Sequence, residues 1–145
     1  MSRVQLALNV SDLDVAVDFY SRLFATSPAK REPGYANFAI AEPPLKLVLF
    51  ERPDAPTRLN HLGVEVESAD AVSAATQRLR GEGLETASED AVTCCYAVQD
   101  KVWVDDPDGA PWEVYTVLSD APTSADCACW TITPLNSARR EAWSG

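Results

Sequence analysis

The feature that most constrains this chain is an internal repeat. Residues 4–10 (VQLALNV) align with residues 60–66 (NHLGVEV) at an offset of 56 (60 − 4 = 56). The alignment places His61, the chain's only histidine, on Gln5. Because an internal repeat decides the architecture, the chain is expected to fold as two related modules. Each module then carries a side chain able to bind a metal at the equivalent point of its first strand.

Both copies continue with the same order of elements: a strand, a helix and three more strands. The first copy predicts a strand over 4–10, a helix capped by Ser11 or Asp12 and ending near Phe24, and strands near 26–31, 36–41 and 45–51. The second copy predicts a strand over 60–66, a helix over 69–81 capped by Ser68, and strands near 84–88, 96–105 and 111–117. The pattern indicates an α+β fold, in which paired βαβββ modules (about 3–52 and 59–118) form a curled mixed sheet around a metal cleft. We therefore expect one domain at 1–118 and a flexible, cysteine-containing tail at 119–145.

The offset between the two copies grows toward their ends. The last strands align best at 65 residues, which places Glu113 on Val48 (113 − 48 = 65) and Trp103 on Phe38 (103 − 38 = 65). The second copy therefore holds nine extra residues (65 − 56 = 9) between its helix and Trp103. Extra length in one of two repeats is often functional, so we expect a functional loop in this interval.

Three polar residues fall at positions where a metal site can form. Gln5 and His61 would face each other on the two first strands, and Glu113 lies on the last strand of the second module. A carboxylate in an apolar strand is costly to bury unless it is paired or binds a metal. The predicted metal ligands are therefore Gln5, His61 and Glu113. Three protein ligands leave coordination positions open, which is typical of a catalytic rather than a structural metal.

The four cysteines have an unusual placement. Cys94 and Cys95 are adjacent and lie in the nine-residue interval, whereas Cys127 and Cys129 lie in the tail. Without an export signal, such cysteines do not indicate a disulfide framework. They indicate thiolate chemistry toward a metal or metalloid in a reducing compartment, with Cys127 and Cys129 either a second thiol site or spectators.

Charge and hydropathy narrow the function classes further. The formal net charge of −10 would repel the phosphates of nucleic acids and of anionic membranes. No apolar run approaches the roughly 20 residues of a membrane-spanning helix, and the start of the chain leaves no room for a signal peptide. We expect a cytoplasmic protein that binds neither nucleic acid nor membranes.

Several segments resemble the vicinal-oxygen-chelate superfamily, which includes glyoxalase I, extradiol dioxygenases, and fosfomycin and bleomycin resistance proteins. The resemblance covers about residues 3–118 and rests on residues 60–64 (NHLGV), 106–109 (DPDG) and 112–115 (WEVY). In that superfamily the first strands of both modules and the last strand of the second supply the metal ligands. This implies the same set: Gln5, His61 and Glu113. Val48 removes a fourth ligand of the glyoxalase I kind, and Gln5 replaces the first histidine of the usual two-histidine, one-carboxylate iron site.

A closer resemblance is to the organoarsenical C–As lyases and the related cadmium-induced proteins of actinobacteria. It rests on residues 34–39 (GYANFA), 94–97 (CCYA) and 99–104 (QDKVWV). The resemblance implies an Fe(II)-dependent dioxygenase that uses dioxygen as co-substrate and releases arsenite from trivalent methyl or aryl arsenicals. It also implies that Cys94 and Cys95 hold the arsenical, with Tyr96 beside them.

The thiol chemistry sets a condition on the structure around the cysteine pair. Two thiolates can replace the two exchangeable hydroxyls of a trivalent arsenical and leave its carbon–arsenic bond intact. Neighbouring residues of a regular strand point to opposite faces, so both sulfurs can meet one arsenic only in a turn or an irregular loop.

Two alternative functions remain open at this point. One is a cadmium- or arsenite-responsive thiol protein without turnover, and the other is a different glyoxalase-like enzyme. Paired modules can also complete their site within one chain or across a homodimer.

Overall fold

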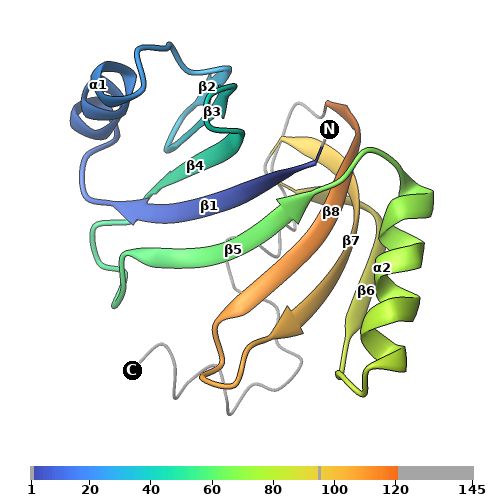
Figure 1. Ribbon diagram of the computed structural model, residues 1–145. Helices are drawn as coiled ribbons and strands as arrows, with labels where there is room; N and C mark the ends of the chain where they lie inside the picture. The colour runs from blue at the N-terminus through green and yellow to red at the C-terminus, as the bar shows by residue number, and fades with distance from the viewer. Residues whose placement is uncertain (1, 95, 121–145) are drawn as a thin grey trace.

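The computed structural model describes residues 2–94 and 96–120 (Figure 1). The first module contains β1 (Arg3–Val10), α1 (Leu13–Leu23), β2 (Lys30–Glu32), β3 (Tyr35–Ile40) and β4 (Leu45–Glu51). The second contains β5 (Leu59–Glu65), α2 (Ala69–Gly81), β6 (Ala87–Cys94), β7 (Ala97–Asp105) and β8 (Pro111–Asp120). All the strands belong to one mixed sheet in the order β2-β3-β4-β1-β5-β8-β7-β6. The predicted α+β fold of paired βαβββ modules is confirmed.

The strand register confirms both offsets of the repeat. β1 runs parallel to β4 with Ala7 opposite Val48, and β5 runs parallel to β8 with Gly63 opposite Glu113. Gly63 follows Ala7 by 56 residues and Glu113 follows Val48 by 65, as the sequence predicts. β1 and β5 pair antiparallel at the centre of the sheet and join the two modules. The modules are therefore related by a pseudo-twofold axis that passes between β1 and β5.

Each helix packs on the outer face of its own module (Figure 1). Leu13 and Val17 of α1 pack with Phe38 and Leu47, and Val72 and Leu79 of α2 pack with Val102. Side chains of the predicted caps accept backbone hydrogen bonds at both helix starts, Asp12 from Val15 and Ser68 from Ala71. Both helices thus leave the inner, concave face of the sheet free for a site.

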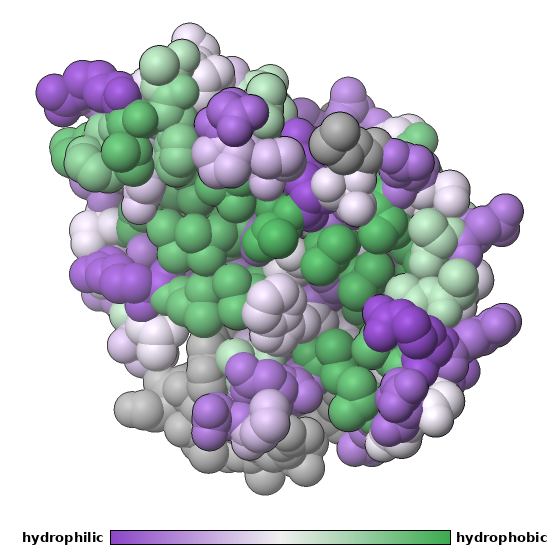
Figure 2. Space-filling view, viewed as in Figure 1, coloured by the Kyte–Doolittle hydropathy of each residue, from purple (hydrophilic) through white to green (hydrophobic). Residues whose placement is uncertain are grey.

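The surface between the two helices is partly apolar. Leu6 and Leu8 of β1, and Leu62 and Val64 of β5, point outward there and are half-buried. Figure 2 shows apolar side chains gathered across the middle of this face. None of the helices in residues 2–94 and 96–120 is long and apolar enough to cross a membrane.

The second module differs from the prediction in its extra residues. A strand near 84–88 followed by a loop is wrong: β6 begins at Ala87 and continues to Cys94, hydrogen-bonded to β7. Pairing satisfies backbone groups that a loop would leave to water. The extra length lies mainly in longer strands, since β6 and β7 have 8 and 9 residues whereas β2 and β3 have 3 and 6. A bulge also interrupts β6 between Glu89 and Val92, with Ala91 at φ 51°. Cys94, the last residue of β6, therefore pairs with Ala97, the first residue of β7.

Candidate metal centre and substrate cleft

The register places the predicted ligands on the concave face of the sheet. Side chains directly opposite each other on paired strands share a face, and one such row runs through Lys46, Gln5, Gly63, Glu113 and Trp103. His61 lies diagonally across from Gln5, because Ala7 faces His61 and Gln5 faces Gly63. A cavity of about 260 Å³ opens over this face and is lined by all three predicted ligands.

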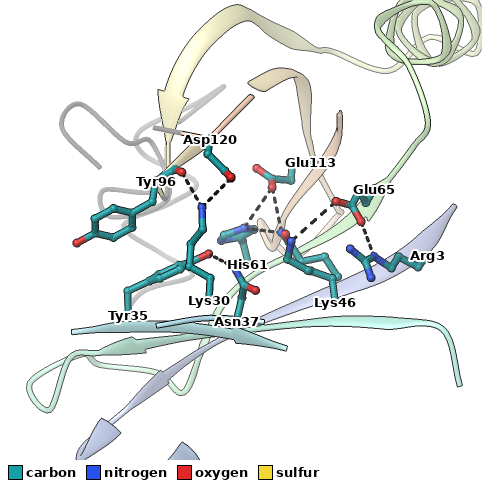
Figure 3. Close-up of polar contacts among 11 residues, drawn as sticks. Arg3, Lys30, Tyr35, Asn37, Lys46, His61, Glu65, Tyr96, Glu113 and Asp120 are labelled. Carbon is teal, nitrogen blue, oxygen red and sulfur yellow. Dashed lines mark hydrogen bonds and ion pairs between the residues drawn. The ribbon is translucent and has the colours of Figure 1, made fainter. Parts of the chain in front are cut away.

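The three predicted ligands meet at one buried point. The amide nitrogen of Gln5 lies 2.9 Å from Nε2 of His61 and donates to Oε1 of Glu113, also at 2.9 Å. The same Oε1 lies 3.6 Å from Nε2 of His61. Relative exposures are 4%, 2% and 1% for Gln5, His61 and Glu113. Donors from three strands therefore converge in the cleft (Figure 3).

Gly63 makes this convergence possible. It lies between Gln5 and Glu113 in the sheet, and a Cβ on it would lie 2.9 Å from both Cγ and the backbone oxygen of Glu113. The same Cβ would lie 3.2 Å from the amide nitrogen of Gln5. Only a residue without a side chain fits between the two ligand-bearing strands.

A hydrogen-bond chain fixes the orientation of His61. Asn60 donates from its amide nitrogen to Oδ1 of Asn9 at 3.0 Å, and Asn9 donates to the backbone oxygen of Thr57 at 3.0 Å. Oδ1 of Asn60 therefore accepts from Nδ1 of His61, 2.7 Å away. With the proton on Nδ1, Nε2 presents its lone pair to the cleft, which is the orientation of a metal-binding histidine.

Lys101 compensates the charge of Glu113. Its ammonium is completely buried and donates to Oε2 of Glu113 at 3.0 Å. Burial alone would raise the pKa of Glu113, but the Lys101 ammonium and the hydrogen bond from Gln5 help to outweigh it and lower that pKa to about 2. The carboxyl is thus ionised, with Oε2 held by Lys101 and Oε1 facing His61 and Gln5.

The donor set fits a divalent metal ion. In an octahedral site with bonds of about 2.1 Å, neighbouring ligand atoms are about 3.0 Å apart. The observed separations are close to this value: 2.9 Å between Gln5 and His61, 2.9 Å between Gln5 and Glu113, and 3.6 Å between His61 and Glu113. The Gln5 amide needs only a half-turn to present its oxygen, since the two ends of the amide have the same shape. No three His, Cys, Asp or Glu side chains gather into a possible metal site in the described part of the chain, so a metal here would need Gln5.

Trp103 lies beside His61, at 5.4 Å between ring centroids with the rings nearly perpendicular. The alignment of Trp103 with Phe38 is wrong by one residue. Glu113 pairs with Trp103, and its counterpart Val48 pairs with Asn37, so Asn37 is the true equivalent. A one-residue shift moves a strand side chain to the opposite face. Trp103 therefore lies on the cleft side, whereas Phe38 packs under α1.

The β6–β7 hairpin borders the cavity. Ala97 lines it, and the ring of Tyr96 lies 5.3 Å from that of Tyr35, which also lines it. Lys30 of β2 donates to the backbone oxygen of Tyr96 and to Asp120, each at 2.9 Å (Figure 3). These contacts connect the first module to the hairpin of the second.

Not all predicted thiol positions fall in the described structure. Cys94 is the last residue of β6, and Tyr96 follows in a turn with φ 64°. Cys95, Cys127 and Cys129 lie outside the described residues, as does most of the predicted tail.

Sequence reasoning missed Gly63, Asn60 and Lys101. Lys101 could have been found from the sequence, because it lies in the apolar segment KVWV. A lysine there, like Glu113 in its strand, is costly to bury unless it has a partner. Asn60 and Gly63 carried none, since their roles depend on the spacing of neighbouring strands.

The fold and the cleft together define an α+β protein of two βαβββ modules with a three-donor pocket on the shared concave face. A family model, the glyoxalase/bleomycin resistance protein/dioxygenase superfamily, matches residues 3–114. The chain belongs to this superfamily.

Two kinds of relative share most of the sequence. A protein named trivalent organoarsenical cleaving enzyme, from Thermomonospora curvata, is 60% identical over 142 residues, covering 95% of this chain and 94% of that protein. The cadmium-induced protein CadI of Mycobacterium tuberculosis is 64% identical over 123 residues, covering 85% and 81%.

Solved structures agree on the fold. An extradiol ring-cleaving dioxygenase from B. fuscum matches with a TM-score of 0.61 and 20% identity, over 82% of this chain and 33% of that one. A Mn(II)-bound glyoxalase from Novosphingobium aromaticivorans matches with a TM-score of 0.59 and 24% identity, over 94% and 46%.

Proposed function

We propose that this protein is an Fe(II)-dependent dioxygenase that cleaves the carbon–arsenic bond of trivalent methyl or aryl arsenicals and releases arsenite. The observation that carries the proposal is the meeting of Gln5, His61 and Glu113 in a cavity that is also lined by Ala97, the strand partner of Cys94. The name of the relative from Thermomonospora curvata supports it, because that relative is similar over nearly the whole chain.

The ligand set suits a metal that must also accept small molecules. Gln5, His61 and Glu113 would hold Fe(II) through one oxygen, one nitrogen and one oxygen, a variant of the facial triad of non-heme iron oxygenases. Bound Fe(II) would supply binding and activation of dioxygen beside the substrate. Because Lys101 occupies Oε2 of Glu113, the carboxylate would bind through Oε1 alone. Gln5 is neutral, so the ligands bring a single negative charge.

The thiols would bring the arsenical to this centre. A compound R–As(OH)2 exchanges both hydroxyls with Cys94 and Cys95, forming two As–S bonds and releasing two water molecules. The carbon–arsenic bond is the one bond left for cleavage. For a methyl arsenical the overall reaction would balance as CH3As(OH)2 and O2 giving As(OH)3 and formaldehyde, so dioxygen oxidises the carbon and arsenic stays trivalent. Tyr96 would border the bound arsenical, since its ring packs on Tyr35 at the cavity wall. Holding both reactants in one pocket supplies the proximity that a two-substrate reaction needs.

One assay tests the proposal. The metal-free protein is loaded with Fe(II) without oxygen and given trivalent methyl or phenyl arsenical. Air is then admitted, and arsenite release and oxygen uptake are measured. Cys95→Ser should abolish arsenite release, and Cys129→Ser is the matched control in the tail. Absence of arsenite from the wild type contradicts the lyase function, and unchanged activity in Cys95→Ser removes the thiol step.

A second candidate is a thiol protein that sequesters cadmium or arsenite without turnover. The name of CadI, the cadmium-induced relative, favours it. This candidate predicts stoichiometric binding of Cd(II) to the cysteines and no arsenite from an organoarsenical in air. The assay above therefore separates the two candidates.

A further inference from the structure

The cavity has a positive charge balance in a strongly acidic protein. The chain carries a formal net charge of −10. Among residues 2–94 and 96–120, the charged side chains that line the cavity, or pair with one that does, are Arg3, Lys30, Lys46, Lys101, Glu65, Glu113 and Asp120. Four cations against three carboxylates leave one positive charge (4 − 3 = 1). A bound divalent metal would add to it, so the pocket favours a ligand that brings negative charge.

One of these cations lies beside the predicted ligands. Lys46 of β4 faces Gln5 directly in the register, and its ammonium is 3.9 Å from Oε1 of Glu65. Arg3 also pairs with Glu65, through the other oxygen. Figure 3 shows Lys46 and Arg3 on either side of this carboxylate. The carboxylate of Glu65 is thus shared between two cations, and its contact with Lys46 is longer than its contact with Arg3.

A buried hydroxyl lies in the neighbouring row of the sheet. Tyr115 pairs with Glu65 in the register, lines the cavity and is 1% exposed. Its hydroxyl has no hydrogen-bond partner among residues 2–94 and 96–120. A buried polar group without a partner is costly, so a ligand oxygen at this point would satisfy it. Tyrosine keeps its proton at neutral pH and would therefore donate to that oxygen.

The cavity is larger than a methyl arsenical requires. Its volume of about 260 Å³ corresponds to roughly nine water molecules at about 30 Å³ each. The methyl group would leave most of this space to water. Val48, Ala39 and Val117 add apolar surface to the lining, which suits the faces of an aromatic ring.

We infer that the cavity binds aryl arsenicals whose ring carries an acidic group, with Lys46 pairing with the acid and Tyr115 donating a hydrogen bond to it. This rests on the proposed function for the identity of the arsenical. The ring lies against the apolar lining, and the arsenic lies toward the predicted metal ligands. Lys46 and Tyr115 determine specificity for the organic group and take no part in bond cleavage.

The test compares two trivalent arsenicals that differ by one carboxylate, phenylarsonous acid and its 4-carboxy derivative. Binding to the full chain is measured at pH 7 without oxygen, with and without Fe(II), from the quenching of tryptophan fluorescence. We expect the wild type to bind the carboxy compound about tenfold more tightly. Lys46→Met should bring the ratio of the two affinities to about one, and Tyr115→Phe should lower it about threefold. Arg22→Met, which removes an exposed cation on α1, is the matched control and should keep the wild-type ratio.

The ratio of the two affinities tests the inference without any measurement of turnover. Equal affinities in the wild type, or an unchanged ratio in both Lys46→Met and Tyr115→Phe, would overturn it. The wild-type comparison needs no substitution and stands even if a variant fails to fold. Arsenite release in air is measured separately: its absence contradicts the proposed function, whereas the affinity ratio still reports on the acid-binding subsite.

Discussion

The exchange of Gly63 for alanine tests whether close strand packing builds the proposed metal centre. The added Cβ would lie 2.9 Å from Cγ and from the backbone oxygen of Glu113, and 3.2 Å from the Gln5 amide. Carbon atoms in contact prefer about 3.5–4.0 Å, so the overlap with Cγ is about 0.6–1.1 Å. Because one of the atoms is backbone, β8 must move away from β5 or Glu113 must change its position.

The expected magnitude follows from this overlap. An extra methyl group in a packed interior costs about 1–3 kcal/mol. For a chain of 145 residues this corresponds to a melting temperature lower by about 3–10 °C. Displacement of Glu113 should also weaken Co(II) or Fe(II) binding by about 10–100-fold, the usual effect of disturbing the groups that support a metal ligand.

The assay pairs thermal unfolding with a spectroscopic Co(II) titration. Gly81→Ala is the matched control, because a Cβ there meets no atom within 4 Å at the end of α2. It should leave metal binding unchanged and stability equal or slightly higher, since alanine loses less entropy on folding than glycine. If Gly63→Ala matches Gly81→Ala in both measurements, the close approach of β5 and β8 does not position the ligands.

Three further outcomes follow from the buried contacts of the cleft. Lys101→Met should lower the free energy of unfolding in urea by about 3–5 kcal/mol, because it leaves the carboxylate of Glu113 buried and uncompensated; a loss below 1 kcal/mol would contradict the pairing. The pKa of Glu113 is lowered in the fold from 4.5 to about 2, so its contribution of about 3 kcal/mol is present above pH 4.5 and is lost as the pH falls toward 2. Urea unfolding between pH 6 and 2 should show this loss in the wild type and much less of it in Glu113→Gln. Asn60→Ala should weaken Co(II) binding about 10–100-fold by freeing the His61 ring, with rescue by Asn60→Asp, which keeps the acceptor for Nδ1.

The repeat made the central strands predictable from sequence. The offset of 56 residues identified β1 and β5 as equivalent, and the offset of 65 matched Val48 with Glu113, which the register confirms. Alternation of apolar residues and the caps Asp12 and Ser68 placed both helices to within two residues. These features are local, or they repeat within the chain, so one sequence contains them.

The features that sequence reasoning missed depend on contacts between strands. The one-residue error at Trp103 arose because matching apolar residues favours Phe38 over the polar Asn37, and only the strand pairing with Glu113 identifies Asn37 as the equivalent. The length of β6 depends on hydrogen bonds to β7, which a pattern of mixed residues did not reveal. Gly63 has no side chain to signal a role, and its importance comes from the 2.9 Å gap to its neighbour.

The pseudo-twofold axis between β1 and β5 has a consequence for how a ligand enters. A perfect duplication would present two identical walls, and a ligand could bind in two equivalent poses related by the axis. Here the axis exchanges Gln5 with His61 but exchanges Glu113 with Val48, so one wall offers a carboxylate oxygen where the other offers only a hydrocarbon side chain. The two poses therefore differ in energy. Because only the second module carries the carboxylate, a nearly symmetric fold binds its ligand in one orientation.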